Sequence, residues 1–194
     1  LAWTDAEHKT LMTETRRITF YATDPEARVF DYSVSLHASE GEVTLGDTKE
    51  GGLLAVRVAS SMDVMGPREG GRIQTATGGI NEGEAWGKRA EWVDFSGPVS
   101  GDWVGIALMD HPSNPRYPTY WHVRNYGLMT INPIALHDYT GDPNKRWDLV
   151  IPAGETVTFA FRVYVHVGDA NEALVADHWH DWVNPPSVEV QTGK

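Results

Sequence analysis

The fold is most clearly indicated by the stretch Thr156–Val167, TVTFAFRVYVHV. Apolar and polar side chains alternate along it, and a period of two places successive side chains on opposite faces of a β-strand. One face carries Arg162, Tyr164 and His166. The other is wholly apolar and is expected to line a core: Val157, Phe159, Phe161, Val163 and Val165.

Shorter strands, separated by turn residues, are predicted through most of the chain before this stretch. Residues 11–21 and 29–39 alternate in the same way, and the Asp24-Pro25 turn between them predicts an antiparallel hairpin. The Gly-rich, polar residues 63–83 predict long hairpin loops. The remaining predicted strands are 42–45, 53–59, 88–95, 103–109 and 147–151.

One convincing helix is predicted, at residues 170–182, where apolar side chains recur at helical spacing. Asp169 can cap its N-terminus, and Pro185 and Pro186 end it. Many short strands followed by one helix indicate an all-β fold. We therefore expect a single domain over residues 1–194: an antiparallel β-sandwich, jelly-roll or mutarotase-like, with one C-terminal α-helix.

Composition excludes several classes of partner. The 194 residues contain 27 Asp and Glu against 16 Lys and Arg, a net charge of −11, which argues against binding to nucleic acid or to an anionic membrane. No apolar run approaches the length of about 18 residues that a membrane span needs. Cysteine is absent, so disulfides and thiol chemistry are excluded. The chain begins at Leu1 without a signal-peptide pattern, and we expect a mature or trimmed chain.

The segment Gly105–Gly127, GIALMDHPSNPRYPTYWHVRNYG, is the strongest candidate for a functional site. It opens with an apolar run typical of a buried strand. Three prolines then predict an ordered, rigid loop over residues 110–119. Such loops often present titratable side chains. Packing of the same rings against the sandwich beneath is the alternative.

Within and near this segment, four residues are candidates for proton transfer: His122, His111, Asp110 and Glu50. An imidazole beside a carboxylate is the usual acid–base pair near neutral pH. His122 is the first candidate, because its neighbours suggest a strand that holds the ring rigidly. Candidates for substrate binding are Arg116 and Arg124 for oxygens, Trp121 and Tyr120 for sugar faces, and Lys49.

A metal site is a further alternative. His111, His122 and Asp110 supply part of a ligand set for copper or zinc. His178 and His180 do not add a chelating pair, because side chains two residues apart on a helix face away from each other.

A family resemblance is carried by three segments: TLGDTKEGG (Thr44–Gly52), KRAEWVDFSG (Lys88–Gly97) and DHPSNPRYPTYWHVRNYGL (Asp110–Leu128). In the same order, over most of the chain, they resemble the DUF6807 family, formerly labelled PmoA or "methane oxygenase". The resemblance implies a bacterial, often exported, β-rich protein encoded near carbohydrate-degradation genes. Family members usually carry a preceding His-rich segment with an HPHHRG-like motif. The 194 residues lack it, and we expect them to be the C-terminal part of a longer protein or to hold part of a site.

Three functions are therefore expected from the sequence. The leading one is a bacterial, periplasmic or secreted protein that binds or transforms a carbohydrate or other small polar ligand at residues 105–127, by His and carboxylate acid–base chemistry. The second is a non-catalytic module or scaffold that assembles with another chain or copy. The third is a mononuclear copper or zinc enzyme.

Overall fold

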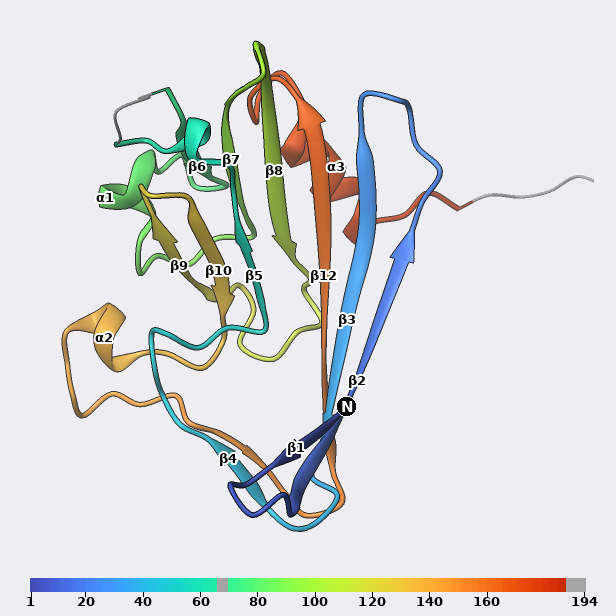
Figure 1. The fold of residues 1–194 in the computed structure, drawn as a ribbon, viewed down its shortest axis with the longest axis vertical. Coiled ribbons are helices and arrows are strands. Elements are labelled where there is room, and N and C mark those ends of the chain that lie inside the picture. Colours follow the sequence, from blue (N-terminus) through green and yellow to red (C-terminus); the bar gives the residue numbers. More distant parts are fainter. Residues whose placement is uncertain (66–69, 188–194) are drawn as a thin grey trace, which may run out of the picture.

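The computed structural model describes residues 1–65 and 70–187, and shows twelve strands in three antiparallel sheets (Figure 1). The largest sheet has seven strands, with β12, the strand predicted from its alternating pattern, at its centre. In spatial order they are β1 (Ala2–Thr4), β2 (Thr10–Phe20), β3 (Arg28–His37), β12 (Thr156–Val167), β8 (Asp102–Asp110), β7 (Trp92–Val99) and β6 (Arg72–Thr75).

Two smaller sheets complete the β-structure. The three-stranded sheet has the order β5 (Leu54–Arg57), β10 (Leu128–Asn132) and β9 (Tyr120–Arg124). The two-stranded sheet pairs β11 (Leu149–Ile151) with β4 (Val43–Leu45). The helices are short: the 3₁₀ turn η1 (Ser60–Met62), α1 (Asn81–Ala85), α2 (His137–Thr140) and α3 (Val175–Val183).

The main core lies between the large sheet and the smaller sheets, as expected for a sandwich. The predicted apolar face of β12 enters it, with Phe159, Phe161 and Val163 at most 1% exposed. Trp121 and Val123 of β9 enter it from the opposite side and are fully buried. Burying each large apolar side chain stabilises the fold by about 1.5–3 kcal/mol. The predicted antiparallel β-sandwich is therefore confirmed.

A second, smaller core lies on the other face of the large sheet, where α3 packs (Figure 1). Tyr164 of β12 meets Val175 and Trp179 of the helix there. The helix begins at Val175, five residues later than predicted, because Leu174 has a left-handed backbone with φ 51°. Asp169 instead closes the preceding turn, since its Oδ1 accepts hydrogen bonds from the amides of Asn171 (2.8 Å) and Glu172 (3.0 Å).

The predicted loop region 63–83 differs from expectation. It contains the edge strand β6 and the short helix α1, and its residues 66–69 lie outside the described part of the chain. β6 is only Arg72–Thr75, too short to give a clear alternating pattern. By contrast, residues 111–119 have no regular secondary structure, as predicted from their prolines.

Alternation along β9 determines which side chains are available on the smaller sheet. Trp121 and Val123 point into the core, so Tyr120, His122 and Arg124 point to the outer face. The helices α1 and α2 lie beside this sheet (Figure 1). The loop between β4 and β5 also approaches it, and these segments together form the candidate site.

Candidate functional site

His122 is the centre of the candidate site on the outer face of the three-stranded sheet. Its residue is only 4% exposed, and its Nδ1 atom has no hydrogen-bond partner among residues 1–65 and 70–187. The indole Nε1 of Trp86, just after α1, is buried and unpartnered within the same ranges. The two rings meet edge to face with centroids 6.4 Å apart. Buried polar atoms are normally paired, so two unpaired ring nitrogens in contacting side chains indicate a place for a missing hydrogen-bonding group.

Aromatic side chains continue from Trp86 along this face. Trp86 packs edge to face on Tyr139 at 5.1 Å, Tyr139 stacks on Tyr120 at 5.3 Å, and Tyr120 meets Trp147 at 5.4 Å. Burial raises the pKa of the Tyr139 hydroxyl beyond its ordinary value, so it stays protonated. The guanidinium of Arg89 lies over the rings of Tyr120 and Trp147. The row thus combines apolar ring surface with polar groups, the Tyr139 hydroxyl and the Arg89 guanidinium.

Asn132 explains why the loop after β4 lies on this face. Its side-chain amide is fully buried and donates to the carbonyls of Thr48 (2.9 Å) and Lys49 (3.2 Å) and to the Tyr139 hydroxyl (3.3 Å). Asn132 is the last residue of β10, and its neighbour on the same face, Thr130, pairs in register with His122. One buried amide thus fixes the Lys49 segment and α2 beside His122.

Charged groups surround His122 in compensated pairs. The Lys49 ammonium lies 3.4 Å from the Asp138 carboxylate, and Arg124 Nε lies 3.0 Å from Glu82 Oε1. Burial lowers the pKa of His122, and the nearby Glu50 carboxylate partly opposes that effect. The imidazole is therefore neutral at neutral pH and can accept a proton.

The structure brings together five of the predicted site residues on this one face: His122, Glu50, Lys49, Arg124 and Tyr120. The other four, His111, Asp110, Arg116 and Trp121, lie elsewhere, so the candidate residues within 105–127 do not share one site. The strand β9 and the loop before it direct their side chains to several different surroundings.

Asp110 and the loop's asparagine form an internal anchor. Asp110 is 1% exposed, and its carboxylate accepts bonds from Asn114 Nδ2 (2.7 Å) and the Thr119 amide (3.0 Å). Burial raises the pKa of Asp110 to about 6, although these two bonds favour the charged form. Asp110 therefore closes the loop on itself, and its carboxylate is not presented on the His122 face.

Arg116 and Trp121 are also structural. Arg116 donates to the carbonyls of Pro133 (2.8 Å), Trp147 (2.6 Å) and Asp148 (2.8 Å), which join the loop to the β10–β11 connection. Trp121 is fully buried, and its Nε1 donates to the Ala90 carbonyl at 2.9 Å. Its rings leave no face on which a sugar could stack, so its assignment to substrate binding is corrected to core packing.

His111 lies next to α3, on the face of the large sheet that is turned away from the main core. Its ring meets the Trp182 indole edge to face at 4.8 Å, and its Nδ1 is 2.7 Å from the Ser113 hydroxyl. Burial lowers the pKa of His111. It cannot act together with His122, because one faces α3 and the other the outer side of the smaller sheet.

A carboxylate–imidazole pair that the sequence did not reveal lies beside the candidate site. Asp47 Oδ1 lies 2.5 Å from His137 Nδ1, and Asp47 Oδ2 accepts from the amides of Leu136 (2.9 Å) and Trp147 (2.6 Å). Burial opposes ionisation of Asp47, but these donors hold its pKa below the ordinary value. Asp47 lies within the TLGDTKEGG segment that carried the family resemblance; only the fold reveals its partner.

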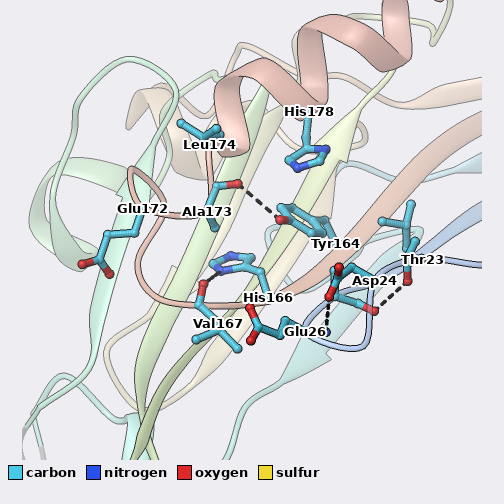
Figure 2. Close-up of a pocket in the computed structure, with 12 residues that line it drawn as sticks. Thr23, Asp24, Glu26, Tyr164, His166, Val167, Glu172, Ala173, Leu174 and His178 are labelled. Carbon is cyan, nitrogen blue, oxygen red and sulfur yellow. Dashed lines mark hydrogen bonds between the residues drawn. The ribbon is translucent and has the colours of Figure 1, made fainter.

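A second missed pair, Asp94 and His166, lies beneath α3. Asp94 Oδ2 and His166 Nε2 are 2.8 Å apart, and both residues are at most 2% exposed. Burial raises the pKa of Asp94, while His166 opposes the rise. Figure 2 shows His166 below Tyr164 and His178, whose rings pack at 4.4 Å; these side chains line a cavity of about 450 Å³. The alternating pattern of β12 predicted that His166 lies on this face. It could not predict that His166 pairs with Asp94.

Metal ligands do not converge in the described part of the chain. Among residues 1–65 and 70–187, no three His, Cys, Asp or Glu side chains are grouped as a metal ion would require. The partial set proposed from sequence is separated, since Asp110 is bound inside its loop and His111 faces α3. Within the same ranges, no helix is both long and apolar enough to cross a membrane.

The fold and this site define an antiparallel β-sandwich protein whose three-stranded sheet holds a buried histidine among aromatic rings, with its Nδ1 unpaired in the described part of the chain. The chain belongs to DUF6807, a family of unknown function, whose model matches residues 1–180. Comparisons with curated proteins and with solved structures gave no match.

Proposed function

We propose that the protein binds a carbohydrate or a similar polyhydroxylated ligand on the outer face of the three-stranded sheet. The observation that carries this proposal is the pair of buried ring nitrogens, His122 Nδ1 and Trp86 Nε1, that have no partner in the described chain. An indole N–H only donates, whereas a neutral imidazole nitrogen can accept. Hydroxyl groups both accept and donate, so neighbouring hydroxyls of one ligand can satisfy both atoms.

The neighbouring groups fit such a ligand. The Tyr120, Tyr139 and Trp86 rings supply apolar surface next to the polar atoms. Lys49 and Arg124 are held by Asp138 and Glu82 and can bind further oxygens.

Acid–base chemistry is the function that we propose for His122 and Glu50. His122 accepts a proton from a ligand hydroxyl or from the carbon next to a carbonyl, and the Glu50 carboxylate stabilises the imidazolium that forms. A positioned acid or base typically contributes about 10²–10⁴ in rate. We propose a periplasmic or secreted setting for this chemistry, consistent with the family resemblance.

The test is a screen of mono- and oligosaccharides for binding and turnover, followed by His122→Asn and Glu50→Gln. The matched control is His180→Asn, because His180 is an exposed histidine on α3. We expect His122→Asn to lower turnover by about 10²-fold or more while the melting temperature is kept. If a substrate is found and folded His122→Asn turns it over at the wild-type rate, the acid–base proposal is wrong.

A binding module without catalysis is the second candidate. It is favoured by the low exposure of His122, 4%, which leaves a reacting atom little access. In that case the same variants weaken saccharide binding, and no turnover is found with any ligand that binds.

A further inference from the structure

A second hollow lies on the face of the large sheet that α3 covers, between the end of α3 and the strands β2, β3 and β12. Its volume is about 250 Å³, which suits a single small ring. Its floor is formed by Ser33 and Ala160, and one wall by Trp182 and His111. Arg17 and Thr19 of β2 line the other side.

The hollow exists because strand pairing stops there. The ladder between β12 and β8 ends at the pair Phe161–Asp110, so Ala160 has no partner residue on β8. The side chain of Asn114 replaces the missing strand: it accepts from the Ala160 amide and donates to the Ala160 carbonyl, both at 2.7 Å. The backbone is satisfied, and the small Ala160 side chain leaves space above the sheet.

One end of the hollow is fixed by a compensated ion pair. Asp31 accepts from Arg162 at 2.7 and 3.1 Å and from the Tyr21 hydroxyl at 2.7 Å. The Arg162 guanidinium lies over the rings of Tyr21 (5.2 Å) and Trp182 (5.0 Å). This stack holds the Trp182 indole at the edge of the hollow and uses most of the acceptor capacity of Asp31.

Arg17 is different, because no acidic side chain pairs with it in residues 1–65 and 70–187. Its neighbour Arg16 points to the other face of β2 and pairs with Glu14. Opposite Arg17, in register on β3, is the neutral Ser33. The hollow thus has an uncompensated guanidinium in a chain whose net charge is −11, and such a group favours an anionic ligand.

Besides Arg17 and the Asp31 carboxylate that pairs with Arg162, the hollow is lined by neutral polar residues that can bind hydroxyls. His111 uses Nδ1 for the Ser113 hydroxyl, which leaves Nε2 for another partner. Thr19 and Ser33, which carry hydroxyl groups, line the same space. Next to the hollow the sheet face continues with hydroxyl side chains, among which Ser35 and Thr158 bond at 2.8 Å.

We propose that this hollow binds one sugar unit that carries a carboxylate, that is, a uronic acid. The carboxylate pairs with the planar guanidinium of Arg17, which matches it with two parallel hydrogen bonds. The sugar ring lies beside the Trp182 indole, and its hydroxyls meet Thr19, Ser33 and His111. This site is independent of His122, which lies on the outer face of the other sheet.

Isothermal titration calorimetry with three ring compounds tests the proposal: glucuronate, glucose and cyclohexanecarboxylate. We expect measurable binding of glucuronate and at least about tenfold weaker binding of the other two, because each lacks one half of the recognised chemistry. Arg17→Gln is expected to weaken glucuronate binding about tenfold or more, and Arg17→Lys by less. Arg57→Gln is the matched control, an exposed strand arginine on the smaller sheet.

Four outcomes overturn the proposal. If glucose binds as tightly as glucuronate, the carboxylate is not recognised. If cyclohexanecarboxylate binds as tightly as glucuronate, the sugar hydroxyls are not recognised. If Arg17→Gln binds glucuronate as the wild type does, the binding site is not this hollow. Absence of any glucuronate binding to the wild-type protein also overturns it. Arg17→Gln is expected to leave binding and turnover of any saccharide found for the His122 face unchanged, so failure here and failure of the proposed His122 function can be told apart.

Discussion

Gly52 lies so close to Thr130 that a Cβ atom added to Gly52 would come within 2.1 Å of the Thr130 Cγ2 atom. Thr130 is the residue paired with His122 across β10 and β9. The close approach therefore sets how near the loop carrying Lys49 and Glu50 comes to the imidazole. Glycine is required there because any side chain would separate the loop from the sheet.

Gly52→Ala is expected to displace this loop and to weaken ligand binding at the His122 face, with a loss of stability of about 1–3 kcal/mol from overpacking. Thr130→Ala removes the colliding methyl group, so the double variant should regain part of both losses. Chemical denaturation and ligand titration of the two single variants and the double variant measure the coupling. Purely additive losses would show that the contact does not position the loop.

The pH dependence of a His122-dependent activity follows from the direction of its pKa. Burial lowers the pKa of His122, so the neutral base persists as the pH falls below the ordinary value of 6.5 and is lost only at lower pH. Because Glu50 raises that pKa, Glu50→Gln should move the acidic limb of the pH–rate profile further down. A limb that moves up, or stays in place, contradicts the assignment of Glu50 as the neighbouring charge.

Asp110 should make the fold less stable as the pH rises. Its folded pKa is about 6 against an ordinary 3.8, so between these values the unfolded chain binds fewer protons than the folded chain. The pKa difference corresponds to roughly 3 kcal/mol of folding stability. This stability is lost as the pH rises from about 4 to about 6, because the buried carboxyl must then ionise. Asp110→Asn removes this dependence.

Urea unfolding of both proteins from pH 3 to pH 7 measures the effect. The free energy of unfolding of the wild type, relative to that of Asp110→Asn, should fall across that range. Replacing the acceptor of the Asn114 and Thr119 bonds adds a cost that does not depend on pH, so it does not change this trend. A flat difference would mean that Asp110 ionises at its ordinary pKa.

Arg116→Gln is expected to destabilise the protein by about 3 kcal/mol, because three backbone carbonyls lose their common donor. The matched control is Arg28→Gln. Arg28 also donates to backbone carbonyls, but it is exposed and bonds only to its own turn, so a change within about 0.5 kcal/mol is expected. Thermal melts compare the two, and equal small effects would show that Arg116 does not join the loop to the β10–β11 connection.

Much of the fold could be read from local patterns. The alternation in Thr156–Val167 identified the strand that proved central to the large sheet, and it separated the core face from the face that α3 covers. The prolines of residues 110–119 identified an irregular loop for a steric reason that acts within a few residues. β6 and the start of α3 were missed because a short edge strand and a left-handed residue leave little local signal.

The candidate site was only partly readable. The sequence singled out His122, Glu50 and Lys49, and the fold brings these three to one face. The sequence also grouped them with Asp110, Arg116 and His111, which the fold places elsewhere. Chemical type identifies a residue that can act, whereas its direction depends on register. Trp121 and His122 are adjacent, yet one fills the core and the other faces outward.

The sequence by itself determined the class of fold, the core faces of its long strands and the residue types able to transfer protons, because these follow from side-chain chemistry and from a period of two. Only the tertiary structure decided which of those residues meet. Asn132 with the Lys49 loop, Asp94 with His166, and Asp31 with Arg162 are contacts between segments far apart in the chain. They are fixed by strand order and by burial of the two cores, and no local pattern records either.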